Sequence, residues 1–204
     1  MSSEAGAQTG SSGKIGLLFG SFNPIHTGHL ILAQYMATHT DLSAVWLVVS
    51  PQSPYKLGHD LLPEQDRLAL AQDATADNEL LSVSDVELRL PKPSYTITTL
   101  DEIRRLHPGR EFVLLMGSDN LLGLDGWRDA GRIRQEFGIY VYPRPGHPVE
   151  SAAVAGANIK VVDAPLLDIS ATLIRQSLQE GKSIRYLVPD AVEKLIAKNG
   201  YWQQ

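Results

Sequence analysis

Apolar runs rich in β-branched residues recur along the chain, and they constrain its fold more than any other feature. A weak run lies at 80–88, and the five well-marked runs lie at 14–19, 44–50, 111–116, 138–143 and 159–164. These runs are apolar throughout rather than alternating, which is typical of strands buried on both faces of a parallel sheet. Stretches with helical spacing separate them, and two more follow at 169–183 and 188–202. The alternation predicts an α/β, doubly wound fold with a parallel central sheet and a helical C-terminal segment.

Length and local composition predict how the chain is divided. Its 204 residues are enough for one sizeable core, so we expect a single domain over 14–204. The small, polar residues 1–13 are expected to form a flexible tail, because they lack the apolar stretch of a secretory signal. No apolar run approaches the roughly 20 residues that span a bilayer, so we expect no membrane partner.

Charge and cysteine content narrow the classes of function. The chain has no cysteine, which excludes disulfides and thiolate chemistry and agrees with a cytoplasmic location. The formal net charge of −5 argues against general nucleic-acid binding, which needs a basic face. It leaves room for a local basic site that binds a small polyanion.

The loop after the first apolar run carries the clearest chemical signal. In a doubly wound sheet, ligands bind beyond the carboxyl ends of the strands. This ranks three loops above the others, those after Phe19, Ser50 and Met116. The first loop, "GSFNPIHTGH" at 20–29, leads into a predicted helix and holds His26 and His29. A helix start attracts anions, and two histidines three residues apart add donors on one face, so phosphate oxygens are a natural partner.

Two other interpretations of this loop stay open. Asn23-Pro24 can form the turn, with the histidines serving only to cap the helix. A metal-binding pair would need a third ligand, and cysteine cannot supply it.

A second anion site is indicated by "DISATLIR" at 168–175. Ser170 and Thr172 stand where a helix should start, and Arg175 follows Thr172 on the same helical face. Hydroxyls, free N–H groups and a guanidinium together can hold phosphate oxygens. The plain alternative is a helix cap with a solvated arginine beside it.

These segments resemble motifs of a known family. "GSFNPIHTGH" resembles the (T/H)xGH signature of the nucleotidyltransferase superfamily, and "DISATLIR" is similar to its ISxTxxR-like segment. Three further segments are "SPQSPYK" at 50–56, "PSYTITTLDEI" at 93–103 and "LLMGSDNLLGLDGW" at 114–127. Taken alone, the first could hold a solvated lysine, the second a helix cap, and the third a turn with a core tryptophan. In order and spacing, the five together resemble bacterial nicotinate-nucleotide adenylyltransferases over about residues 14 to 202.

The resemblance implies a Rossmann-like nucleotidyltransferase fold and a specific reaction. An adenylyl group would pass from ATP to nicotinate mononucleotide, giving deamido-NAD and pyrophosphate in NAD biosynthesis. Mg²⁺ would be bound to the ATP. The acceptor phosphate would attack the α-phosphorus in line, without a covalent intermediate. A phosphate monoester has a second pKa near about 6, so it needs no general base at neutral pH. The enzyme must align the reactants and neutralise developing charge.

The resemblance also implies which residues form the site. Three would be catalytic: His26, His29 and Arg175. ATP would be bound by Gly28, Gly117, Asp119, Ser170, Thr172 and Arg175. Nicotinate mononucleotide would be bound by Gly20, Ser21, Phe22, Asn23, Lys56, Tyr95, Thr96 and Trp127. No side chain is expected to serve as a permanent metal ligand.

Within the acceptor site, Lys56 would meet a phosphate and Trp127 would stack on the pyridine ring. Backbone donors and hydroxyls at Tyr95-Thr96 would receive the nicotinate carboxylate. Nicotinamide would be rejected because its amide brings N–H₂ donors toward groups that already donate.

One departure from the family pattern matters, because Asn23 stands where the commonest form of the family has aspartate; a second, at Ser53 in "SPYK", is minor. Since no base is required, we predict that asparagine preserves activity. Alternatives are an adenylyltransferase for nicotinamide mononucleotide or another phosphorylated acceptor, a catalytically dead nucleotide-binding regulator, and an interaction protein. His26, His29 and Arg175 are all retained, which argues against a dead site. The family often forms dimers or larger assemblies, so a homo-oligomer is one option.

Overall fold

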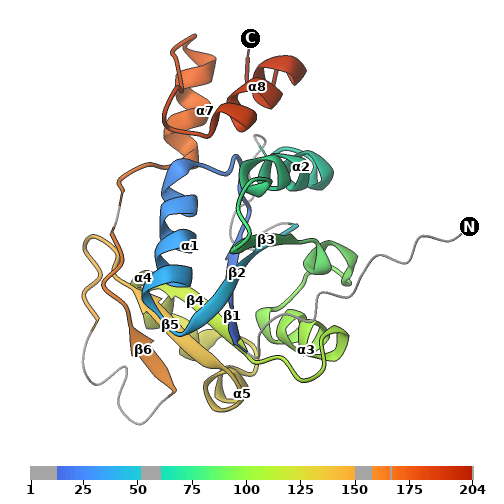
Figure 1. The fold of residues 1–204 in the computed structure, drawn as a ribbon, viewed down its shortest axis with the longest axis vertical. Helices are drawn as coiled ribbons and strands as arrows, with labels where there is room; N and C mark the ends of the chain where they lie inside the picture. Colours follow the sequence, from blue (N-terminus) through green and yellow to red (C-terminus); the bar gives the residue numbers. More distant parts are fainter. Residues whose placement is uncertain (1–12, 52–60, 150–157, 166, 204) are drawn as a thin grey trace, which may run out of the picture.

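A six-stranded, wholly parallel sheet forms the centre of the computed structural model, which describes residues 13–51, 61–149, 158–165 and 167–203. Its strand order is β3-β2-β1-β4-β5-β6 (Figure 1). The strands are β1 (Lys14–Gly20), β2 (Leu42–Val49), β3 (Leu81–Ser84), β4 (Phe112–Gly117), β5 (Gly138–Tyr142) and β6 (Ile159–Val161). The predicted parallel α/β sheet is confirmed. The chain reverses its direction of travel across the sheet between β1 and β4, where ligands bind in such folds.

Helices cover both faces of the sheet. They are α1 (Thr27–His39), α2 (Glu64–Thr75), α3 (Thr96–Leu106), α4 (Ser118–Leu122), α5 (Ala130–Glu136), α7 (Ala171–Gln179) and α8 (Asp190–Asn199). Short 3₁₀ turns form η1 (Val86–Arg89) and η2 (Leu124–Gly126). The helices α1, α2, α7 and α8 share one apolar core with the sheet, and α3, α4 and α5 share the other. Figure 1 shows α7 and α8 beyond the start of α1, where Thr27 N donates to Leu187 O.

One predicted boundary differs from the structure, and another lies almost wholly outside the described residues. The weak run at 80–88 is a strand only as far as Ser84, where the Ser84 hydroxyl accepts from Val86 N and the chain turns into η1. The tail predicted over 1–13 lies outside the described residues except for Gly13, and β1 begins at the next position. Among the described residues, no helix combines the length and apolar character needed to cross a membrane.

A buried arginine fixes the edge of the sheet where β1 and β2 end. Arg67 on α2 is fully buried, and its Nε donates to Leu62 O at 3.0 Å. Its Nη1 donates to Ser21 O at 2.5 Å and to Ser50 O at 2.6 Å, and its Nη2 donates to Pro51 O at 2.6 Å. One guanidinium therefore ties together the loop after β1, the end of β2 and the segment before α2.

Replacing this guanidinium should destabilise the fold strongly. In Arg67→Met the four carbonyls lose their donor while staying buried, so we expect the free energy of unfolding to fall by about 3 kcal/mol or more. Urea unfolding followed by circular dichroism measures this change. Arg89→Met is the matched control, because Arg89 is 75% exposed and pairs only with Asp85 among described residues. It should cost no more than about 1 kcal/mol. Equal losses in the two variants would contradict the role given to Arg67.

Candidate active site

A cavity of about 610 Å³ opens at the carboxyl edge of β1, at the switch point of the sheet. It lies between the loop after β1, the start of α1, the start of α4, the segment after β5 and the start of α7. The predicted site residues that line it are Gly20, Ser21, Phe22, Asn23, His26, Gly28, His29, Asp119, Ser170, Thr172 and Arg175. Segments far apart in the sequence thus meet where the motifs predict a nucleotide site.

Ring packing positions the two histidines. Phe22 is buried and has a positive φ of 45°, which turns its ring back onto Gly20. A Cβ on Gly20 would lie 2.8 Å from that ring, so the position requires glycine. The Phe22 ring meets the His29 ring edge-on at 5.1 Å, and His29 stacks on His26 with 3.6 Å between centroids. The loop therefore fixes both imidazoles through contacts that begin at a glycine.

His26 is held as a neutral donor. It is the N-cap of α1, is only 6% exposed, and its backbone N donates to His29 Nδ1 at 3.3 Å. Burial, together with the smaller effect of the nearby charge of Arg144, lowers the pKa of His26 to about 4. A neutral imidazole donates from one nitrogen only. His26 Nδ1 is buried and has no hydrogen-bond partner in the described part of the chain.

At the start of α7, the sequence left open a phosphate site or a helix cap beside a solvated arginine, and the structure bears on each part. Ser170 is a plain N-cap, because its hydroxyl accepts from Leu173 N at 3.1 Å. Arg175 is not simply solvated: its Nη1 donates to Asn23 O at 2.9 Å and its Nη2 contacts Thr172 Oγ1 at 3.4 Å. Its Nε is buried without a partner among the described residues. Arg175 therefore links α7 to the loop after β1 and keeps one donor for a ligand.

The last residue of β4, Gly117, allows two charged side chains to approach each other. A Cβ on Gly117 would collide with Asp119 Oδ1 and would lie 3.0 Å from Arg144 Cγ. Arg144 Nε is 3.9 Å from Asp119 Oδ1, and Arg144 N donates to Ser118 Oγ at 2.8 Å. Arg144 lines the cavity but was not among the sequence predictions. Its position, two residues after a buried strand that ends at the same sheet edge, is the signal that could have found it.

Several predicted acceptor residues lie elsewhere. Lys56 falls outside the described residues. Tyr95, Thr96 and Trp127 are not among the described residues that line the cavity. They form a second group, in which Tyr95 caps α3, Trp127 packs against the second core, and the Arg128 guanidinium lies 4.7 Å from the Tyr95 ring centroid. Through Arg128, the sequence neighbour of Trp127, the start of α3 thus approaches the segment that holds Trp127, apart from the described lining of the cavity.

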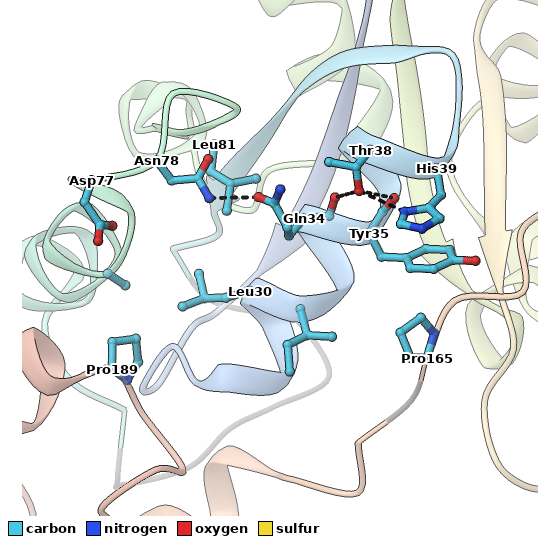
Figure 2. A pocket seen from close by; sticks show the side chains of 12 residues that line it. Leu30, Gln34, Tyr35, Thr38, His39, Asp77, Asn78, Leu81, Pro165 and Pro189 are labelled. Atoms are coloured by element: carbon cyan, nitrogen blue, oxygen red, sulfur yellow. Dashed lines mark hydrogen bonds between the residues drawn. The ribbon is translucent and has the colours of Figure 1, made fainter.

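A second hollow, of about 510 Å³, lies between α1, the end of α2 and the start of α8 (Figure 2). Figure 2 shows its polar contacts, where Asn78 Nδ2 donates to Gln34 Oε1 at 2.8 Å and Thr38 Oγ1 contacts His39 Nδ1. None of the described residues lining it is a lysine or arginine. Because phosphate groups need cationic partners, they suit the first cavity.

Comparison with known proteins identifies the family. The cytidylyltransferase-like family model matches residues 17–177. The "Probable nicotinate-nucleotide adenylyltransferase" of Cytophaga hutchinsonii is 49% identical over 189 residues, which cover 93% of this chain and 98% of that one. Its namesake in Flavobacterium johnsoniae is 44% identical over 192 residues, covering 94% and 100%. The chain belongs to the nicotinate-nucleotide adenylyltransferase family.

Solved structures agree on the fold. The Plasmodium falciparum nicotinic acid mononucleotide adenylyltransferase complexed with NaAD superposes with a TM-score of 0.75 at 16% identity, covering 93% of this chain and 97% of that one. The same enzyme complexed with APC gives a TM-score of 0.74, with the same identity and coverage. Such distant likeness shows the nucleotidyltransferase fold, which confirms the predicted class.

Family membership confirms the predicted activity. The chain is a nucleotidyltransferase of NAD biosynthesis that carries out adenylyl transfer, and the alternatives of another acceptor or a dead regulator are not favoured. Nucleotidyltransferases of this family use ATP, typically with a divalent metal. Among the described residues, no three histidine, aspartate or glutamate side chains gather to hold a metal ion.

The buried histidine should make stability depend on pH. A histidine in the unfolded chain has a pKa near about 6.5, whereas His26 has a pKa of about 4. As the pH falls from roughly 7 to roughly 4.5, His26 becomes protonated in the unfolded chain but stays mostly neutral in the folded chain. We expect this to remove about 2–3 kcal/mol from the free energy of unfolding. Urea unfolding at both pH values measures it, and His26→Asn should lack this component. Parallel losses in wild type and variant would contradict the assignment.

Proposed function

We propose that this cavity binds the triphosphate of ATP and the phosphate of nicotinate mononucleotide for adenylyl transfer between them. One observation carries the proposal. In the described part of the chain, the buried side-chain polar atoms without a partner are His26 Nδ1 and Arg175 Nε, and both residues line this cavity. Buried polar groups are nearly always paired. A ligand with many acceptor oxygens, such as a polyphosphate, would satisfy both.

The charge distribution around the cavity supports a polyanion. The starts of α1 and α7 both contribute to its lining, and neither helix has an acidic residue in its first turn. The free N–H groups and partial positive charge of two helix starts therefore face the same space. The guanidinium groups of Arg144 and Arg175 add full charges at its edge.

These groups suit catalysis by alignment and charge neutralisation. The acceptor phosphate is mostly dianionic at neutral pH, so it attacks the α-phosphorus without a general base. Neutral His26 and its stacked partner His29 donate hydrogen bonds to phosphate oxygens, and Arg175 neutralises charge that develops on the leaving pyrophosphate. Because ring packing already fixes both imidazoles, little reorganisation is needed as the transition state forms.

The start of α3 supports recognition of nicotinate. No side chain caps this helix at Tyr95, and its first turn has no acidic residue. Its N–H groups can therefore receive a carboxylate, whereas a nicotinamide group would present N–H donors to other donors. Trp127 and Thr96 belong to the same group of residues, and the roles of both, like that of Lys56, stay predictions.

We further propose that Mg²⁺ enters with ATP. Magnesium prefers oxygen ligands and is usually held by substrate phosphates, water and one or two carboxylates. Asp119 is a carboxylate on the cavity wall, and the described residues offer no three-ligand cage. When bound, the ion would neutralise charge on the phosphates.

The acceptor assay tests the proposed function. We expect pyrophosphate release from Mg-ATP with nicotinate mononucleotide, at a kcat/KM at least about 100-fold above that with nicotinamide mononucleotide. A coupled pyrophosphate assay with each acceptor measures this, and reactions lacking acceptor give the background. Equal use of both acceptors would refute the carboxylate site at α3. No release with either would refute the proposed function.

Asn23 gives a second test, because the family motif that this loop resembles most often has aspartate at that position. Asn23 Oδ1 accepts from Leu62 N at 3.0 Å, a role that an aspartate oxygen can fill equally well. We expect Asn23→Asp to keep kcat/KM within about threefold of wild type, since no base is needed. A rise of more than about tenfold would show that a carboxylate contributes to the reaction. Asn23→Ala is the control, and it should lose about 1 kcal/mol of stability with that hydrogen bond.

A further inference from the structure

Glu87 is a buried carboxylate that the proposed chemistry does not use. It lies in η1, is 6% exposed, and accepts two hydrogen bonds from hydroxyls: Ser50 Oγ to Oε2 and Ser94 Oγ to Oε1, both at 2.7 Å. Among the described residues, no lysine, arginine or histidine forms an ion pair with it. A charge buried beside neutral partners alone is costly, and stability by itself does not favour such a group.

The first partner of Glu87, Ser50, is hydrogen-bonded to a residue of the cavity wall, Gly20. Ser50 follows β2, and its backbone N donates to Gly20 O at 2.9 Å. The Ser50 carbonyl in turn accepts from the buried Arg67. Ser50 is thus held by two backbone hydrogen bonds beside the loop that carries the histidines. Its hydroxyl therefore donates to Glu87 from a fixed position.

The second partner belongs to the nicotinate side. Ser94 immediately precedes Tyr95, the N-cap of α3, and it lies in the segment 90–95, which has no helix or strand of its own. Among the described residues, this segment is also held by the ion pair of Lys92 with Glu64, in which the lysine side chain is 54% exposed. Exposed ion pairs contribute little. The half-buried bond from Ser94 to the buried Glu87 is therefore the stronger constraint on where α3 begins.

We propose that Glu87 is a positioning residue for the acceptor, because it sets the distance between the start of α3 and the loop after β1. Nicotinate mononucleotide carries a carboxylate at one end and a phosphate at the other. A carboxylate site at α3 and a phosphate site at the cavity must then stand at a fixed separation. This inference rests on the proposed function, since it assumes that the acceptor carboxylate binds at the start of α3.

Steady-state kinetics with each substrate varied in turn tests the inference. In Glu87→Ala both hydroxyl bonds are lost, and we expect the KM for nicotinate mononucleotide to rise about tenfold or more. The KM for ATP should stay within about twofold, since ATP does not contact α3. The preference for nicotinate over nicotinamide mononucleotide should fall as well.

Conservative and matched variants separate positioning from a merely structural role. Glu87→Gln can keep a bond to each serine, because a hydroxyl both donates and accepts, so it should restore most of the affinity. Ser94→Ala should raise the same KM and add little in the Glu87→Ala background, as expected for partners in one interaction. Glu64→Ala, which removes the exposed anchor of the same segment, should leave the KM unchanged.

The outcomes distinguish this inference from the proposed function. If wild type uses nicotinate mononucleotide but Glu87→Ala keeps its KM, or loses only kcat equally with both acceptors, Glu87 has no positioning role. If Glu87→Ala does not fold, Ser94→Ala decides the matter alone, and an unchanged KM there overturns the inference. If wild type uses neither acceptor, the proposed function fails and the inference fails with it.

Discussion

The guanidinium of Arg67 is the constraint on which the site depends. In a parallel sheet the loops leave from one edge, and their carbonyls pass beyond the reach of neighbouring strands. Arg67 supplies donors to carbonyls of Ser21, Ser50 and Pro51 from a single buried, planar group. A lysine could not place its donors in this fork. Burial lowers the pKa of Arg67 and the charge of Glu64 acts against this, while the hydrogen bonds of the guanidinium in the described part of the chain go to four carbonyl oxygens.

The geometry of the site extends outward from this point through short, directional contacts. One path runs from Gly20 through the Phe22 ring to the stacked histidines. Another runs from Ser50 through Glu87 to Ser94 at the start of α3. Each path joins segments that are distant in sequence, and each ends at groups suited to bind an anion. The two sites proposed for the acceptor therefore depend on one common anchor.

Local signals made much of the fold predictable. The buried strands, the helix starts at His26, Tyr95 and Ser170, and the turn at Gly117 all follow from short patterns in the chain. The roles of Arg67, Glu87 and Arg144 do not. Arg67 lies among charged residues in "PEQDRLAL", a pattern that equally suits a solvent-facing position. Its burial depends on where the loop after β1 and the two ends of the β2–α2 connection converge, which only the tertiary structure fixes. Likewise, nothing local indicated that Tyr95 and Trp127 would gather away from the cavity.

Arg175 shows why loop structure and phosphate binding are coupled in this fold. Its Nη1 donates to Asn23 O, and thus holds the loop that carries the histidines, while its Nε is buried and has no partner among the described residues. A phosphate that accepts from Nε would bind a guanidinium that is already fixed in place. Binding would therefore require little additional ordering of the side chain. The bond from Arg175 to Asn23 O joins α7 to the loop after β1 at the cavity. A substitution that loosens the Asn23 turn should therefore displace Arg175 and weaken phosphate binding at the proposed site.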